Sequence, residues 1–303
     1  MTASMADHEA CADVLHRSGS SFTLPIRLLP AAKRRGTTAL YAFCRRADDI
    51  VDDAADPGGA RGLLDAFGAD LRGALAGGAS ADPVIRAVVD TVRRFAVPVN
   101  YLHDILDGVR MDLDHGTYDT FPDLEHYCRR VASAVGLAAI HIWGFRSPAE
   151  ALPAAHACGL AFQLTNILRD VPEDLSRDRV YLPRDDFRSA GCSLDDLRGG
   201  RIGPEFERLA VLGVARAADC YRRAAALDRL LSTDGRIVFR AMYGVYGELF
   251  AAVRAAGARI FTERVRPGRG PLIAATLATV VLGPRPPRDA GRRRSAVAGG
   301  RVP

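Results

Sequence analysis

The sequence predicts an all-α protein, and three observations support that fold class. Apolar residues recur every three or four positions in long segments, for example over residues 84–95 and 124–142, as on the buried face of a helix. Neither a sustained alternation of apolar and polar residues nor an Asn-Gly turn indicates strands or hairpins. Alanine, the residue with the highest helix propensity, is abundant. We therefore expect a bundle of helices without a sheet.

The interruptions between these segments are short, so they predict loops within one domain. They are rich in glycine and proline and fall at residues 56–62, 76–83, 145–150, 197–204 and 266–271. We expect a single helical domain over residues 1–283 and a disordered tail, rich in Pro, Gly and Arg, over residues 284–303. The apolar segment Leu272–Leu282 is too short to span a bilayer. It predicts a core helix, with contact to a membrane surface as the alternative.

The charge of the chain is concentrated at its end. The net charge is +5, and residues 284–303 alone hold six arginines and one aspartate, which is 6 − 1 = +5. The remainder is close to neutral, so no nucleic-acid partner is expected. The N-terminus has acidic residues and no apolar run, which argues against a signal peptide, and six scattered cysteines suit free thiols. We expect a cytoplasmic protein whose tail is either solubilising or attracted to anionic lipid at the inner face of the membrane.

Residues 40–56 contain the first functional signal, a group of carboxylates at the end of an apolar helix. Asp48 and Asp52 are four residues apart, so they share one face, and Arg45 precedes them. Like charges at this spacing destabilise an isolated helix by a few tenths of a kcal/mol. Either the helix end is solvated, or a cation lies beside these carboxylates.

A second polar face follows in residues 159–183. Asn166, Asp170 and Asp174 are spaced by four residues, and Gln163 lies three before Asn166. The opposite positions are apolar. Pro172 lacks the backbone donor that a helix needs, so it should end or kink the helix near Asp170.

Two such helices predict divalent cations held between them. Carboxylate and amide oxygens favour Mg²⁺ or Mn²⁺ over zinc, and Mg²⁺ commonly bridges one or two carboxylates to a substrate phosphate. Arginines near both acidic segments would bind the oxygens of a diphosphate; they are Arg45, Arg169, Arg177 and Arg179.

Three ordered motifs resemble those of the squalene/phytoene synthase family. They are YAFCRRADDIVD from Tyr41, YCRRVASAVG from Tyr127, and Q-x-x-N-I-x-R-D-V-x-x-D from Gln163, which is followed by RVYLP. The resemblance covers roughly residues 15–280. Cys158, Ala139 and Asp178 depart from the family's usual residues and leave the length of the substrate open, but every motif acid and arginine is present.

The resemblance implies an all-α isoprenoid synthase-type bundle with a central cavity. Asp48 and Asp52 on one wall, and Asn166, Asp170 and Asp174 on the other, would hold Mg²⁺ (or Mn²⁺) against the diphosphates. The four aspartates would thus be catalytic, together with Tyr127 near the reacting carbons. The implied substrate-binding residues are Tyr41, Arg45, Gln163, Arg169, Arg177, Tyr246 and Arg264.

The implied reaction is the head-to-head (1′–1) condensation of two prenyl diphosphates with release of diphosphate. Two geranylgeranyl diphosphates would give phytoene, for carotenoid biosynthesis. The alternative is two farnesyl diphosphates, which give presqualene diphosphate, squalene or dehydrosqualene. NADPH is not expected for the phytoene reaction, and the chain has no Gly-rich dinucleotide signature. A catalytically silent lipid-binding homologue is the alternative of another class. The sequence leaves open whether the protein is a monomer or a homodimer.

Overall fold

The computed structural model describes residues 2–20, 22–52, 56–114 and 117–287, and these residues are helical almost throughout. Within these ranges there is no named strand, and the one isolated β-bridge joins Phe145 to Leu231. The predicted all-α class is therefore confirmed. The expected disorder of the tail concerns residues that lie mostly outside the described ranges.

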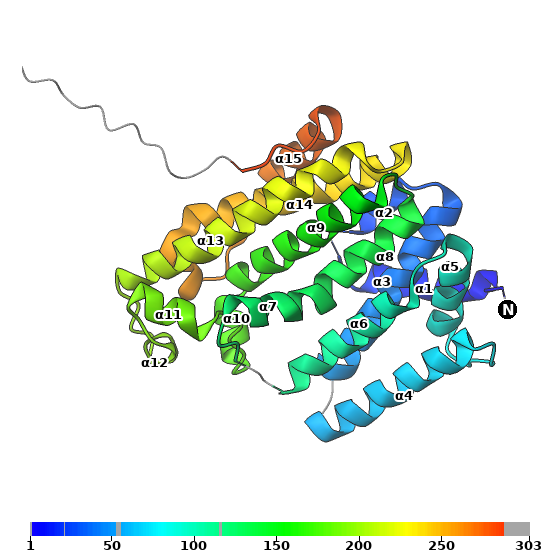
Figure 1. Ribbon diagram of the computed structural model, residues 1–303, viewed down its shortest axis with the longest axis horizontal. Helices are drawn as coiled ribbons and strands as arrows, with labels where there is room; N and C mark the ends of the chain where they lie inside the picture. Colours follow the sequence, from blue (N-terminus) through cyan, green and yellow to red (C-terminus); the bar gives the residue numbers. More distant parts are fainter. Residues whose placement is uncertain (1, 21, 53–55, 115–116, 288–303) are drawn as a thin grey trace, which may run out of the picture.

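The N-terminal half supplies the helices on one side of the molecule. They are α1 (Met5–Arg17), α2 (Thr23–Arg27), α3 (Ala31–Asp52), α4 (Pro57–Leu75), α5 (Pro83–Phe95), α6 (Val99–Met111) and the short 3-10 helix η1 (Asp112–Asp114). In Figure 1, α4 lies at one edge and α3 runs toward the middle of the bundle. The helix α3 packs against α1, α5 and α8, so it is a central element.

The C-terminal half completes the bundle. Its central helices are α7 (Phe121–Cys128), the π-helix η2 (Arg129–Ser133), α8 (Ala134–Trp143) and α9 (Pro148–Arg169). They are followed by α10 (Val171–Ser176), α11 (Arg184–Ala190), α12 (Leu194–Arg198), α13 (Glu205–Ala224), η3 (Ala225–Arg229), α14 (Thr233–Ala256), η4 (Gly257–Phe261) and α15 (Arg269–Leu282). The helix α13 packs along α9, and α15 lies on α14 at the edge opposite α4 (Figure 1).

The end of α9 follows the expectation from Pro172. The helix stops at Arg169, Asp170 has non-helical angles (φ −102°, ψ 11°), and α10 begins directly with Val171. Pro172 lies in the first turn of α10, where its missing N–H has no intrahelical partner to lose. This break turns the chain immediately after Asp170 and places α10 across the end of α9.

The π-helix η2 follows Cys128 directly and is packed closely against α9. A Cβ atom added at Gly159 would lie 2.5 Å from Ser133 Cα, so only glycine fits there. The Ser133 hydroxyl is buried and donates to His156 O at 3.0 Å, which ties η2 to α9. Single π-helical turns are frequent at functional sites, and this one forms part of a cavity wall.

The helix α15 contradicts the prediction of a core helix over Leu272–Leu282. It has no buried residue, because only one of its faces packs on α14. Ile273, Leu277 and Val281 have exposed fractions of 60%, 61% and 74%. Periodicity revealed a helix but could not reveal that nothing in the described chain covers its second apolar face. None of the described helices combines the length and apolar character needed to cross a membrane.

Candidate active site

A cavity of about 360 Å³ lies between α3, η2–α8, α9 and α14. Each of α3 and α9 lines it with residues three or four positions apart, so one face of each helix forms a wall. On α3 these are Thr37, Leu40, Tyr41, Cys44, Arg45 and Asp48. On α9 they are Ala155, Cys158, Gly159, Phe162, Gln163 and Asn166. On both helices the apolar lining comes first and the polar residues last, so the cavity has an apolar body and one polar end.

Aromatic rings close the body of the cavity between α2, α9 and α14. Tyr246 stacks on Phe162 at 4.1 Å and on Phe22 at 5.8 Å between ring centroids. Tyr41 meets Phe22 edge to face and donates its hydroxyl to Ser18 Oγ at 2.8 Å. The predicted residues Tyr41, Gln163 and Tyr246 therefore all line the cavity.

Asp48 is the carboxylate that lines the cavity at its polar end. Its neighbour Arg45 pairs with Asp49 at 2.6 Å, and no arginine of the described chain lies within ion-pair distance of Asp48. Although its side chain is accessible from the cavity, the surrounding protein desolvates the carboxylate and raises its pKa to about 7, and the negative charges of Asp112 and Asp52 add to this.

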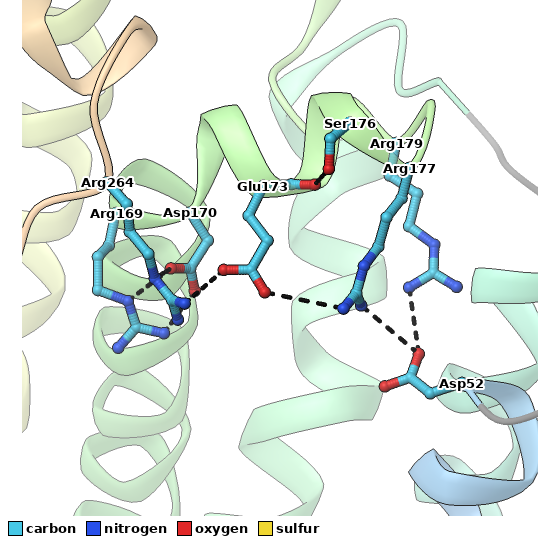
Figure 2. A network of polar contacts seen from close by, with 8 residues as sticks. All are labelled: Asp52, Arg169, Asp170, Glu173, Ser176, Arg177, Arg179 and Arg264. Carbon is cyan, nitrogen blue, oxygen red and sulfur yellow. Dashed lines mark hydrogen bonds and ion pairs between the residues drawn. The ribbon is translucent and has the colours of Figure 1, made fainter.

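The end of α9 carries carboxylates that are already paired with arginines (Figure 2). Arg169 Nε donates to Asp170 Oδ1 at 2.7 Å, and Arg264 Nε reaches the same oxygen at 2.9 Å. Arg264 Nη1 also lies 2.5 Å from Glu173 Oε2. Three predicted residues, Arg169, Asp170 and Arg264, thus meet, and Glu173, which was not among the predicted residues, joins them.

Asp52 links the two acidic segments. Its Oδ1 lies 3.5 Å from Arg179 Nη1 and 4.0 Å from Arg177 Nη1, and Arg177 also lies 3.7 Å from Glu173 (Figure 2). Asp52 ends α3, and the two arginines follow α10. The contact between Arg179 and Asp52 therefore joins residues that are 127 positions apart in the chain. The two stretches selected from the sequence are therefore neighbours in space.

Asn166 and Asp174 complete the predicted metal-binding set. Asn166 lines the cavity, and its Oδ1 is buried without a hydrogen-bond partner among the described residues. Burial, with the nearby Asp170 charge as the next cause, raises the pKa of Asp174 to about 7. Both groups would gain from a cation, because an unsatisfied buried oxygen and a desolvated carboxylate each cost free energy.

Tyr127 does not line the cavity. It is buried beside it, stacked on Tyr181 with 5.2 Å between ring centroids, and its hydroxyl donates to Asp112 Oδ2 at 3.2 Å. Tyr181 donates to the other oxygen of Asp112 at 3.0 Å. Burial raises the pKa of Asp112, and these two hydrogen bonds oppose the rise. Sequence reasoning missed Asp112, because it lies at the end of α6 outside any motif and only the fold brings it near Asp48.

The donor set at the polar end suits Mg²⁺ or Mn²⁺. Asp48, Asp52, Asn166, Asp170 and Asp174 offer only oxygen atoms, and the unpartnered Asn166 Oδ1 is a free ligand. In the described part of the chain, no three acidic, histidine or cysteine side chains lie close enough to hold a metal ion by themselves. The arrangement therefore suits a cation that takes some of its ligands from a bound diphosphate or water.

Comparison with known proteins decides the family of this chain. The family model described as squalene/phytoene synthase matches residues 15–270, which include every wall of the cavity. The chain belongs to the squalene/phytoene synthase family. Members of this family are prenyl transferases, so the cavity is the candidate active site of an enzyme of that class.

Relatives within the squalene/phytoene synthase family agree in sequence and in fold. The 15-cis-phytoene synthase of Synechococcus elongatus is 34% identical over 268 residues, which cover 85% of this chain and 87% of the relative. The phytoene synthase of Mycobacterium tuberculosis is 36% identical over 255 residues, with 83% of each chain covered. A dehydrosqualene synthase crystal structure in complex with a ligand superimposes with a TM-score of 0.83 at 28% identity, covering 91% of this chain and 96% of that one.

A further structure of the family shows that both product classes are represented among the similar proteins. The squalene synthase of Alicyclobacillus acidocaldarius has a TM-score of 0.70 at 30% identity and covers 85% of this chain and 92% of its own. The expected isoprenoid synthase-type bundle is thus confirmed. The similar proteins thus include phytoene, dehydrosqualene and squalene synthases.

Proposed function

We propose that this protein condenses two molecules of geranylgeranyl diphosphate head to head, giving phytoene and diphosphate. The observation that carries the proposal is the cavity with an apolar body and one polar end, where carboxylates and arginines from α3, α9 and α10 meet. Such a shape holds a prenyl chain and its diphosphate in separate environments. Phytoene synthases at 33–36% identity over most of the chain favour the twenty-carbon substrate.

The arginines at the polar end would bind the diphosphates. Arg169, Arg177 and Arg264 lie within one network, and Arg45 borders the cavity on the opposite wall. A guanidinium group offers two parallel donors to phosphate oxygens, so these side chains would fix the leaving group before ionisation. Stabilising charge that develops on the leaving group is the largest contribution expected here.

The carboxylates and Asn166 would hold the metal. Asp48 and Asp52 would act from α3, and Asn166, Asp170 and Asp174 from α9 and α10. Bound Mg²⁺ (or Mn²⁺) would neutralise diphosphate oxygens as the carbon–oxygen bond breaks. The two unusual features of the set, the free Asn166 oxygen and the raised pKa of Asp48 and Asp174, support this assignment.

The body of the cavity would protect the allylic cation that remains after ionisation. Apolar and aromatic side chains exclude water, and ring faces such as that of Tyr246 stabilise a cation by about 0.5–2 kcal/mol. Burial raises the pKa of Tyr246 and, more strongly, that of Tyr127 above the ordinary value, so both phenols stay protonated at neutral pH. We therefore assign the departing proton to the released diphosphate, and to Tyr127 a positioning role through Asp112.

One assay separates the candidate reactions. Purified protein and Mg²⁺ are incubated with geranylgeranyl or farnesyl diphosphate, with and without NADPH, and the products are identified by mass spectrometry. Phytoene formed from the twenty-carbon substrate without NADPH is the expected result. Presqualene diphosphate, squalene or dehydrosqualene from farnesyl diphosphate alone would support the alternative. Release of no diphosphate from either substrate would support the catalytically silent homologue.

We also infer peripheral contact with a membrane, because substrate and product are lipids. The exposed face of α15 (Ile273, Leu277 and Val281) lies between Arg266, Arg269 and Arg285, so an apolar strip is bordered by positive charge. Leu277→Glu should reduce flotation with vesicles that contain phosphatidylglycerol. Val211→Glu, at a residue of α13 that is 56% exposed, is the matched control and should float like the wild type. Equal flotation of both variants would contradict this inference.

A further inference from the structure

A second hollow, lined by residues outside the three sequence motifs, lies between α1, α2 and α3. Its volume is about 450 Å³, within the range of sites that hold small ligands. Five of the residues that line it are basic or histidine, and none is acidic: His8, His16, Arg27, Arg34 and Arg35. We call this hollow the basic pocket.

The arginines of the basic pocket are not neutralised by the protein. Many arginines of the described chain pair with an aspartate or glutamate, as Arg86 does with Asp7 at 2.5 Å. Within the same ranges Arg27, Arg34 and Arg35 form no ion pair. Three like charges that line one hollow without an ion-pair partner repel one another, so the pocket favours an anion.

His8 lines the basic pocket, and its pKa is affected by the positive charge of Arg35. Its Nδ1 is buried and has no hydrogen-bond partner among the described residues. Burial lowers the pKa of His8, and the charges of Arg35 and Arg94 lower it further, while Asp90 on α5 and Asp7 on α1 itself oppose this. An imidazole that lines the same hollow as three arginines is a further donor for an anion once it is protonated.

We propose that the basic pocket binds phosphate-bearing anions at a site separate from the active-site cavity. Arginines of α2 and α3 that line one hollow suit phosphate oxygens, and the histidines of α1 line it as well. The basic pocket shares only Ile26 with the cavity, so α2 is the wall between the two. An anion bound there would link Arg27 of α2 to Arg34 and Arg35 of α3 and so stabilise the position of α2. This inference does not depend on the proposed reaction.

Two sources of the phosphate group are compatible with this chemistry. A soluble phosphate or diphosphate needs only the basic pocket. A phospholipid headgroup would also bring acyl chains to Leu24 and Leu28, which flank Arg27 on α2 and are 68% and 49% exposed. The test therefore has one arm for each source.

Histidine NMR tests the basic pocket selectively. His8 and His16 line it, whereas no described histidine lines the active-site cavity. Full-length protein with ¹³C-labelled histidine is titrated with inorganic phosphate and then with diphosphate, at constant pH and without divalent metal. The expected result is a saturable shift of the His8 and His16 Cε1–H signals, while His103, His126, His141 and His156 stay in place. Absence of a saturable shift with both anions would overturn the proposal.

Matched variants show whether the arginines cause the shift. Arg34→Gln with Arg35→Gln should weaken the apparent affinity about tenfold or more, equivalent to roughly 1.4 kcal/mol. Arg72→Gln, at an exposed arginine of α4 without an ion pair in the described chain, should leave it unchanged. If the double variant fails to fold, Arg27→Gln on α2 replaces it. Equal affinity in the wild type and a folded pocket variant would refute the site.

The second arm identifies the source of the phosphate. Flotation is compared with phosphatidylglycerol and phosphatidylcholine vesicles, for the wild type and the folded pocket variant. A selective loss with phosphatidylglycerol, together with the NMR shift, assigns the basic pocket to a lipid headgroup. An NMR shift without any change in flotation assigns it to a soluble phosphate or diphosphate.

Discussion

The two acidic walls at the polar end of the cavity differ in how their carboxylates are balanced. On α3, Asp48 has no ion pair in the described structure, and its pKa rises to about 7 beside Asp112 and Asp52. At the end of α9, Asp170 is held by Arg169 and Arg264. Asp48 thus has no arginine partner in the described structure, although Asp52 of the same wall lies near Arg177 and Arg179, whereas Asp170 already has two arginine partners. This difference suggests that the α3 wall depends most on a bound cation, whereas the α9 wall also orients phosphate through its arginines.

The largest expected effect comes from removing one carboxylate on each wall. Asp48→Asn should lower turnover by about 10²–10³-fold, the range found when one group that stabilises developing charge is removed. Its unfolding temperature should stay the same or rise, because the substitution relieves repulsion with Asp112 and Asp52. Steady-state kinetics and thermal unfolding measure the two properties.

Asp170→Asn is the comparison for the other wall. Turnover should fall as strongly, but the free energy of unfolding should also drop by about 1–2 kcal/mol, because Arg169 loses a charged partner in a partly buried site. Equal stability changes in the two variants would show that the walls do not differ as described. Wild-type turnover in either variant would mean that its carboxylate is not a metal ligand.

A smaller effect is expected from the arginine that spans the second wall. Arg264→Gln removes the contacts to Asp170 and Glu173, so kcat/KM for the prenyl diphosphate should fall about tenfold. Stability should change by less than about 1 kcal/mol, because the side chain is partly exposed. Arg198→Gln, which breaks an exposed pair with Asp178, is the control and should keep wild-type kinetics. A tenfold loss in the control as well would indicate a general effect of charge.

The sequence predicted the helices and the members of both walls because their information is local. Spacings of four place Asp48 with Asp52, and Asn166 with Asp170, on one face whatever the tertiary structure. Asp112 and Glu173 could not be selected, because their roles depend on contacts between elements distant in the chain. The exposure of α15 was missed for the same reason. A periodic apolar face shows that a helix forms, but not whether another element covers it.

The wall formed by α9 also depends on close packing, which a single methyl group should disturb. Gly159→Ala places a Cβ atom 2.5 Å from Ser133 Cα, so the π-helix must move. We expect a loss of about 2–3 kcal/mol in unfolding free energy, together with reduced turnover. Chemical denaturation checks this, with Gly247→Ala as control, since a Cβ there meets nothing within 4 Å. Similar behaviour of the two variants would contradict the packing argument.

The smallest effect concerns Asp7, which does not line the cavity. Asp7 is paired with Arg86, whereas Asp48 has no ion pair in the described structure. The hydrogen bond from Arg86 lowers the pKa of Asp7 from 3.8 to about 2. Its stabilisation is therefore present above pH 4 and lost as the pH falls through about 2. Asp7→Asn should cost about 1–2 kcal/mol at pH 7, and the difference from the wild type should shrink below pH 4. Asp13→Asn, at an exposed residue of the same helix, is the matched control and should unfold at pH 7 like the wild type.

The most direct test of the central claim is the stoichiometry of the reaction itself. Purified protein, Mg²⁺ and geranylgeranyl diphosphate are mixed without NADPH, and diphosphate and hydrocarbon are quantified in the same samples. The cavity and its two walls predict phytoene with two diphosphates released per molecule, and both products formed about 10²–10³-fold more slowly by Asp48→Asn. Diphosphate release with only a twenty-carbon alcohol or hydrocarbon would contradict the head-to-head condensation.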